Sequence, residues 1–332
     1  MTVVERGGLR GVAAGPVLDL YRGRDVPLGD TTIVRRLLPN LGRRLVGPWC
    51  FVDHYGPDDI TTSPGMQVAP HPHIGLQTVS WLLRGEVHHR DSIGSDQVIR
   101  PGELGVMTSG RGIAHSEQSP ATHPGDLHGV QLWVALPDDV RQTAPAWQHV
   151  GDLPTLSNGA MHATVFMGEL SDAKSPGAAF SPIVGADITL TGAGEEVLAL
   201  EPDFEYGVLV MDGAVEVDPS TSSGHGVRVG VGSFLYLGTG RAALRFGPVD
   251  GRPARMMLLG GAPFDEKIVM WWNFVARSTE EIVEAREQWA SLDQRFGGPH
   301  PVAGYHDGPV IPAPPMPAGR LKPSGGPRER KA

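Results

Sequence analysis

The stretch of residues 70–119 begins with PHPHIG (residues 70–75) and ends with GRGIAHSEQS (residues 110–119), and the rest of the chain is organised around it. His71 and His73 stand two positions apart in it, and the other pair is His115 and Glu117. On a β-strand, side chains two positions apart point to the same face of the sheet. Two neighbouring strands would therefore direct three imidazoles and one carboxylate into one cavity.

These four side chains form a candidate metal site. Three nitrogens and one oxygen suit Fe(II), Mn(II), Ni(II), Cu(II) or Zn(II) better than Ca(II) or Mg(II), which prefer oxygen ligands. A His-x-His pair by itself is common and is more often ordinary surface or core chemistry. The second pair stands at strand spacing after a Gly-x-Gly turn, and together the two pairs favour a metal site.

The residues between the two pairs predict strands and tight turns. Residues 77–83 (QTVSWLL) are apolar and β-branched and predict a strand, and residues 84–86 (RGE) predict a turn. Residues 98–103 (VIRPGE) predict a further strand that ends in a Pro-Gly corner. This pattern fits a small β-barrel that holds a ligand between its inner strands.

The composition favours an all-β protein and argues against several functions. The chain has 332 residues, which favours two domains, and its 45 glycines and 30 prolines indicate many turns. A net charge of −9, without long charged runs, argues against direct binding of nucleic acid. The single cysteine, Cys50, lies in an apolar run where we expect it to be buried. With no signal peptide and no membrane-length apolar run, we expect a cytoplasmic protein, and we take it to be a monomer.

Six motifs are spread over nearly the whole chain: PWCFVDHYGP (48–57), HPHIG (71–75), RPGE (100–103), MTSGRGIAHSE (107–117), QLWVALP (131–137) and MWWNFVARS (270–278). In these motifs the chain resembles the pirin family of the cupin superfamily. The resemblance implies an all-β protein of two tandem cupin-type barrels (double-stranded β-helix or jelly-roll barrels) with a C-terminal helix. It also implies one iron in the N-terminal barrel, held by the residues that match the two ligand pairs.

Three regions follow from this organisation. We assign residues 1–150 to an N-terminal metal-binding barrel, because residues 145–158 form a polar, proline-bearing connection. Residues 151–298 form a C-terminal, degenerate barrel that includes a helix. Residues 299–332 form a Pro/Gly-rich tail, and we expect its last dozen residues to be disordered.

The helix is predicted at residues 278–296. Ser278 and Glu281 form an expected capping box at its start, and Gly297 ends it. A helix needs a surface to pack on, and a barrel wall is the expected one. Its apolar positions recur at three-and-four spacing: Ile282, Ala285, Trp289, Leu292 and Phe296.

An internal repeat predicts that the second barrel lacks the ligands. Residues 101–112 (PGELGVMTSGRG) align with residues 231–242 (VGSFLYLGTGRA) at an offset of 130. The same offset puts Arg245 and Gly247 where the second ligand pair stands. Residues 201–205 (EPDFE) are expected in place of the first pair. We therefore expect one metal per chain.

The expected substrate pocket rests on strand spacing near the ligands. Residues 128–137 predict a strand that puts Gln131 and Trp133 on one face. If that face is the cavity wall, it offers an amide and a stacking surface, although Trp133 serves equally well in a core. Asp53 or His54 could face the cavity or form a structural corner, and a structural, hydrogen-bonded pair is the favoured interpretation. The residues assigned to the pocket are Gln77, Met107, Gln131 and Trp133.

The resemblance implies two functions of different classes. Some bacterial pirins are similar to quercetin 2,3-dioxygenases, which implies a small aromatic, flavonol-like substrate, with Glu117 as both ligand and general base. Eukaryotic pirins act as transcription cofactors, which implies a non-enzymatic, redox-sensing iron protein that regulates a protein partner. Sugar-binding or isomerase chemistry is disfavoured, because Gln77 stands where those cupins usually have a Glu ligand.

Overall fold

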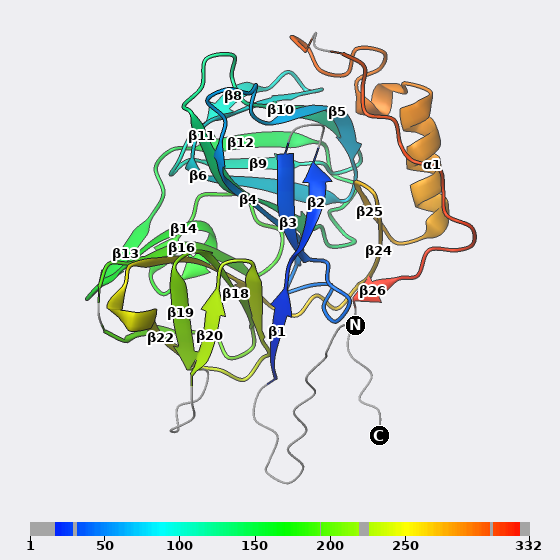
Figure 1. Cartoon of the computed structure of the whole chain (residues 1–332). Coiled ribbons are helices and arrows are strands. Elements are labelled where there is room, and N and C mark those ends of the chain that lie inside the picture. The colour runs from blue at the N-terminus through cyan, green and yellow to red at the C-terminus, as the bar shows by residue number, and fades with distance from the viewer. Residues whose placement is uncertain (1–16, 29–31, 193, 219–225, 306–307, 326–332) are drawn as a thin grey trace, which may run out of the picture.

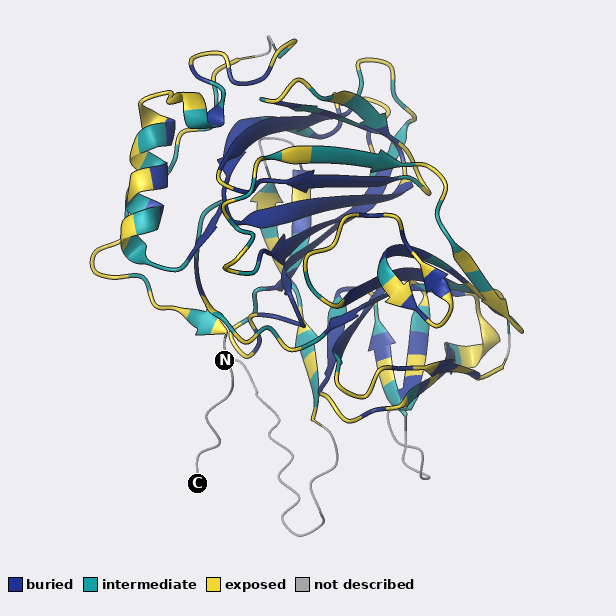
Figure 2. Cartoon of the chain, turned by 180° about the vertical axis from the view of Figure 1, so that it is seen from behind, coloured by how far each residue is buried: buried dark blue, intermediate teal, exposed yellow. Residues whose placement is uncertain are grey.

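The computed structural model describes residues 17–28, 32–192, 194–218, 226–305 and 308–325, which form two β-barrels with one α-helix on the outside (Figure 1). The predicted all-β architecture of two tandem barrels is confirmed. Each barrel combines a four-stranded sheet with a larger sheet. The strands of both barrels are largely buried (Figure 2).

The N-terminal barrel carries the predicted ligands on its smaller sheet, which has the order β5-β10-β7-β8. These strands are β5 Gln67–His73, β10 Ile113–Gln118, β7 Val87–Asp91 and β8 Asp96–Ile99. The larger sheet has the order β12-β9-β6-β11-β4-β3-β2. Its strands are β12 Ala146–Val150, β9 Leu104–Thr108, β6 Leu76–Arg84, β11 Asp126–Ala135, β4 Trp49–Asp59, β3 Thr32–Leu38 and β2 Arg24–Leu28.

The C-terminal barrel repeats this arrangement. Its smaller sheet, β17-β22-β19-β20, consists of β17 Glu196–Ala199, β22 Ala243–Pro248, β19 Ala214–Asp218 and β20 Val227–Gly230, and a 3-10 turn at Val249–Gly251 follows β22. The larger sheet has the order β1-β21-β18-β23-β16-β14-β13, with β15 beside β14. Its strands are β1 Leu18–Arg22, β21 Ser233–Leu237, β18 Glu205–Asp212, β23 Ala254–Gly261, β16 Ile183–Leu190, β14 Met161–Leu170, β13 Thr155–Asn158 and β15 Ala173–Lys174.

One edge strand crosses between the barrels. β12, the last strand of the first barrel in the chain, pairs with β9 of the same barrel. β1 precedes the first barrel but pairs with β21 of the second. The expected boundary at residue 150 falls directly after β12, whereas residues 18–22, which we expected in the first barrel, lie in a sheet of the second.

The contact between the barrels is packed like a core. Trp49 Nε1 donates to the carbonyl oxygens of Val184 and Gly260, both at 3.1 Å. Trp81 Nε1 donates to the Asp187 carboxylate at 2.8 Å. Buried apolar side chains from both barrels form one continuous cluster around these two tryptophans. The two barrels therefore stabilise each other through burial and through satisfied buried polar groups.

The helix, α1, spans Thr279–Ala290 and packs on the short strands β24 (Lys267–Trp271) and β25 (Phe274–Ala276). Ser278 caps it by accepting from the Glu281 N–H at 3.2 Å. The capping box is only half formed, because the Glu281 carboxylate binds Arg141. No helix among the described residues is long and apolar enough to cross a membrane.

The predicted helix end at residue 296 is wrong. Leu292 has a φ of 57° and its side chain is exposed, so the chain leaves the helix after Ala290. A separate 3-10 turn at Gln294–Phe296 follows, and it ends at Gly297, whose φ is 97°. Phe296 is buried although it lies in this separate turn, so the apolar spacing continues past the end of the helix. The spacing alone therefore does not distinguish a helix followed by a turn from one longer helix.

The C-terminal segment at residues 308–325, which we call the strap, runs back along the helix (Figure 1). Its Ile311 carbonyl accepts from Trp289 Nε1 at 2.9 Å, and its Leu321 N–H donates to Thr279 Oγ1 at 3.1 Å. It ends in β26 (Ser324–Gly325), which pairs with β24. The disorder expected for the last dozen residues is therefore wrong for residues 321–325, and residues 326–332 lie outside the described part.

The second barrel has other residues where the ligands stand. Arg245 on β22 pairs with Val197 on β17, in the way that His115 on β10 pairs with His71 on β5. Arg245 forms an ion pair with Glu195 at 3.3 Å on the surface. The expectation that residues 201–205 replace the first ligand pair is wrong, because the strand that matches β5 ends at residue 199.

We predict that Trp81→Phe lowers the free energy of unfolding by about 1–2 kcal/mol, because it removes the bond to Asp187 and part of the buried ring. Urea unfolding of parent and variant measures this difference. Trp271→Phe on the partly buried strand β24 is the matched control and should cost less. Equal losses for both variants would contradict the role given to the contact between the barrels.

Candidate metal centre

The pairing of β5 with β10 brings the two ligand pairs together. His71 lies directly opposite His115, and Glu117 lies opposite Val68, so the register shifts between these positions. Two residues of β5, at positions 69 and 70, therefore face Ser116 alone. Position 70 is a proline, which lacks the N–H that a regular ladder needs, and a bulge accommodates it.

Three histidines converge beside this bulge. The candidate ligand nitrogens of His71, His73 and His115 all lie within 4.8 Å of one another, and the three side chains are buried. His73 Nε2 and His115 Nε2 are 3.1 Å apart. Two nitrogens bound at right angles to one metal, each at ~2.1 Å, would be about 3 Å apart. Among the described residues this is the group of three or more potential ligands that could hold a metal ion.

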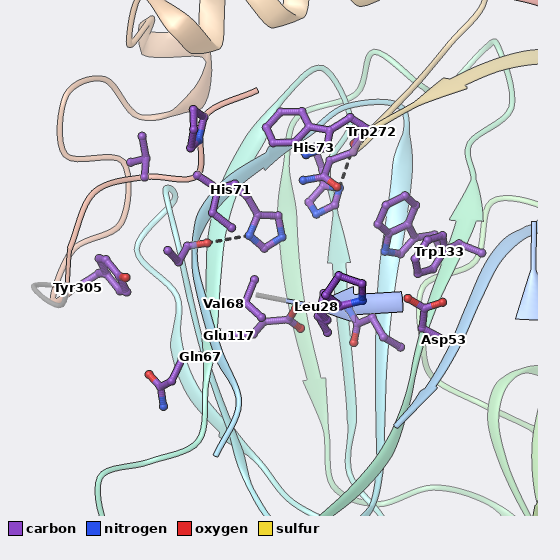
Figure 3. A pocket seen from close by; sticks show the side chains of 18 of the residues that line it. Leu28, Asp53, Gln67, Val68, His71, His73, Glu117, Trp133, Trp272 and Tyr305 are labelled. Atoms are coloured by element: carbon purple, nitrogen blue, oxygen red, sulfur yellow. Dashed lines mark hydrogen bonds between the residues drawn. The ribbon is translucent and has the colours of Figure 1, made fainter. Parts of the chain in front are cut away.

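The hydrogen bonds of His71 and His73 leave their other nitrogens free for a metal. His71 Nδ1 lies 2.9 Å from the Ala69 carbonyl oxygen, and His73 Nδ1 lies 3.0 Å from that of Asn273 (Figure 3). A carbonyl only accepts, so each Nδ1 carries the hydrogen and each Nε2 keeps a lone pair. Burial lowers the pKa of His71 to about 4. These neutral, oriented imidazoles fit a first-row transition metal.

Glu117 lines the same cavity but stands apart from the three-histidine group. Its carboxylate accepts from Ser80 Oγ at 3.3 Å, and Ser80 also contacts the Gln131 side-chain oxygen at 3.0 Å. Burial raises the pKa of Glu117 to about 7, although bonds from Ser80 and Gln131 oppose that shift. Near neutral pH this carboxyl can therefore hold or release a proton without a metal nearby.

The cavity in front of the histidines has a volume of about 660 Å³, within the usual range for small-molecule sites. The rings of Phe51 and Trp133 stack at 4.0 Å and form one aromatic wall (Figure 3 labels Trp133). Arg36 lies over Phe51 and binds the Asp53 carboxylate through two bonds of 2.9 and 2.7 Å. The cavity thus combines aromatic surface with a fixed ion pair.

The strap closes another side of the cavity. Val310 and Ile311 line it, and Tyr305 lies at its edge (Figure 3). The Ile311 N–H donates to the Pro70 carbonyl at 2.8 Å. The carbonyl groups of both bulge residues therefore have specific partners: one holds the His71 ring and the other holds the strap.

The structure separates the four residues expected in the substrate pocket. Gln131 and Trp133 line the cavity. Gln77 does not, because its amide is fully buried and donates to Thr108 Oγ1 and to the Ala178 carbonyl, both at 3.0 Å. Met107 is fully buried and also lies away from the cavity lining.

Other expectations near the site had different outcomes. Cys50 is buried, as predicted, and burial raises its pKa to about 12. Asp53 and His54 do not form a pair: Asp53 faces the cavity and binds Arg36, and His54 Nε2 lies 2.8 Å from His128 Nε2. The alternation along residues 51–53 indicates that Phe51 and Asp53 share a face, a signal that the sequence interpretation did not use.

An all-β chain of two tandem barrels, with three buried histidines in one of them, defines the protein as a two-domain cupin. The family model Pirin matches residues 31–134, and the model of the pirin C-terminal cupin domain matches residues 185–297. A Pseudomonas aeruginosa protein provisionally named quercetin 2,3-dioxygenase is 42% identical over 301 residues, which is 91% of each chain. The chain belongs to the pirin family.

Solved structures agree with this assignment. The crystal structure of a quercetin 2,3-dioxygenase from Acinetobacter baumannii superposes with a TM-score of 0.85 at 38% identity, covering 92% of this chain and 97% of that one. A bacterial pirin from Escherichia coli, determined in complex with nickel(II), has a TM-score of 0.58 at 16% identity and covers 75% of this chain and all of that one. The second likeness supports the fold alone.

We predict that Glu117→Gln stabilises the metal-free protein at high pH but not at low pH. The folded protein binds the Glu117 proton with a pKa of about 7, against an ordinary value of 4.5. The free energy of unfolding therefore falls by up to about 3 kcal/mol as the pH rises from about 4.5 to 7. Chemical unfolding at pH 5 and pH 8 in the presence of a chelator measures the difference.

The gain from Glu117→Gln should be several-fold larger at pH 8 than at pH 5. Glu216→Gln on the surface strand β19 is the matched control and should show no such dependence. A gain that is the same at both pH values would mean that Glu117 is not a buried group with a raised pKa.

Proposed function

We propose that this chain binds one transition metal, with iron as the expected ion, and uses it to cleave flavonol-type aromatic substrates with dioxygen. The single observation that carries the proposal is the convergence of three buried imidazoles on one point of an aromatic-walled cavity. The likeness to the Acinetobacter baumannii quercetin 2,3-dioxygenase supports the substrate class.

The proposed metal ligands are His71, His73, His115 and Glu117. The lone pairs on Nε2 of His71 and His73 favour a metal at this point, and the nickel(II) in the Escherichia coli pirin is consistent with such an ion. Glu117 would complete the set by exchanging its bond to Ser80 for the ion. A bound metal would supply Lewis acidity and the redox chemistry that dioxygen requires.

Side chains of the cavity also have roles that need no metal. Trp133, which is backed by Phe51, provides a stacking surface for a planar ring. While Glu117 is bonded to Ser80 and not to the ion, its pKa is about 7 and it can accept the proton of an acidic phenol hydroxyl. The strap residues Val310 and Ile311 limit the entry of water to this cavity.

We predict that anaerobic reconstitution with Fe(II), followed by oxygen and quercetin, gives oxygen uptake and loss of the flavonol absorption band. Mn(II), Ni(II), Cu(II) and Zn(II) are tested in parallel. Glu117→Gln should lower the turnover about 100-fold or more, because a general base is lost. His162→Ala, an exposed histidine on β14 of the second barrel, is the control and should leave the turnover unchanged.

Metal analysis of the same samples separates binding from catalysis. The parent should hold about one ion per chain, and His73→Ala should hold far less. If the parent binds a metal but no metal supports turnover, the dioxygenase proposal fails, and a redox-sensing protein that binds a protein partner becomes the better account. If the parent binds no metal, the proposed centre itself is wrong.

A further inference from the structure

A fourth buried histidine, His89, lies next to His115. His89 on β7 and His115 on β10 face each other through their Nδ1 atoms at 3.3 Å. His89 Nε2 lies 3.1 Å from the Asp91 carboxylate. All three side chains are buried. Asp91, His89 and His115 therefore form a continuous line that leads to the candidate metal centre.

The hydrogen-bond donors of this line can be assigned from its far end. The Asp91 carboxylate accepts from the backbone N–H groups of Ile93 at 3.0 Å and Ser95 at 2.9 Å, both at one oxygen. Its other oxygen faces His89, and a carboxylate only accepts, so His89 Nε2 donates. Neutral His89 then has a lone pair on Nδ1. His115 Nδ1 must donate to it, which leaves the lone pair of His115 on Nε2.

His115 Nε2 is the atom that lies 3.1 Å from His73 Nε2. Because His71 and His73 keep their hydrogens on Nδ1, all three imidazoles now present lone pairs at Nε2. Backbone carbonyls hold the Nδ1 hydrogens of His71 and His73. The His89 side chain does this for His115, whose Nδ1 bonds no carbonyl in the described part of the chain.

The position of His89 is fixed from two directions. Strand pairing puts Asp91 opposite His115 and His89 opposite Glu117. Trp147 on β12 stacks on the His89 ring at 3.7 Å, with an angle of 7° between the ring planes. β12 is the edge strand of the larger sheet of the first barrel, where it pairs with β9. This edge strand therefore holds the imidazole that orients a candidate ligand.

We propose that His89 is a positioning residue that fixes the tautomer of His115, and that Asp91 sets the direction of the hydrogen bonds along the line. The proposal rests on the proposed metal centre, but not on any catalytic activity. Groups that orient metal-bound histidines in this way typically contribute 10- to 100-fold to metal affinity.

Asp91→Asn is the sharpest test, because it preserves the size of the side chain and reverses the direction of the hydrogen bond to His89. The amide oxygen can keep the two backbone N–H bonds, so the amide NH₂ then faces His89 Nε2 and donates to it. His89 would place its hydrogen on Nδ1, and His115 would place its own on Nε2, where it blocks the metal. Asp96→Asn, at an exposed aspartate on the neighbouring strand β8, is the matched control.

The measurement is the dissociation constant for Co(II), obtained by chelator competition, together with the visible spectrum of bound Co(II). We expect Asp91→Asn and His89→Phe to raise the dissociation constant about 10- to 100-fold and to change the spectrum. His89→Phe keeps a ring to stack on Trp147. His89→Asn returns an acceptor near the Nδ1 position and should recover part of the affinity, whereas Asp96→Asn should match the parent.

Thermal unfolding of the metal-free variants identifies any that fail to fold, and the remaining variants decide the result. If the parent binds Co(II), and Asp91→Asn or His89→Phe is folded and binds it with the parent's affinity and spectrum, the line of hydrogen bonds has no role and the inference is wrong. A parent that binds no Co(II) overturns both this inference and the proposed metal centre. If the variants lose affinity for Co(II) and the parent cleaves no flavonol, the inference is supported and the dioxygenase proposal fails.

Discussion

The antiparallel pairing of β5 with β10 is the contact on which the candidate centre depends. It puts His71 opposite His115. The bulge at residues 69 and 70 shifts the register, so that Glu117 lies opposite Val68. The carbonyls of these bulge residues hold the His71 ring and the strap. A proline in this strand would be a defect in a regular ladder, but here it frees backbone oxygens for the site.

The rest of the molecule supports this pair of strands from outside. Ile74 directly follows His73, and Ala114 directly precedes His115. Both are buried against the apolar face of α1. Asn273, just before β25, supplies the carbonyl that orients His73. The helix and the segments around it are therefore part of the N-terminal site, although they follow the C-terminal barrel in the chain. The second barrel contributes through its buried contact with the first and through its pairing with β1, which precedes the first barrel in the chain.

Much of this was predictable from local patterns. Strand spacing predicted that His71, His73 and His115 converge, and the repeat at an offset of 130 predicted that Arg245 stands where His115 does. Both depend on periodicity, which the sequence records directly. The Ser278 cap was likewise predictable, because it involves neighbours in the chain.

The remaining features depend on contacts between distant segments. Nothing near His73 in the sequence indicates that its partner is Asn273, 200 positions away. The strap over the cavity and the stacking of Trp147 on His89 are likewise contacts between segments that are far apart in the sequence. Gln77 stands where some cupins have a Glu ligand and was assigned to the pocket, yet its amide faces Thr108 and Ala178 instead. Its position in the sequence did not predict which buried partners its side chain would bind.

Anomalous diffraction can show whether three imidazoles hold one metal in the first barrel. Crystals of the protein reconstituted with Fe(II) or Ni(II) would be measured on both sides of the absorption edge of that metal. We expect one strong anomalous peak per chain, within bonding distance of Nε2 of His71, His73 and His115. A peak elsewhere, a second peak of equal height in the C-terminal barrel, or no peak at full metal loading would contradict it.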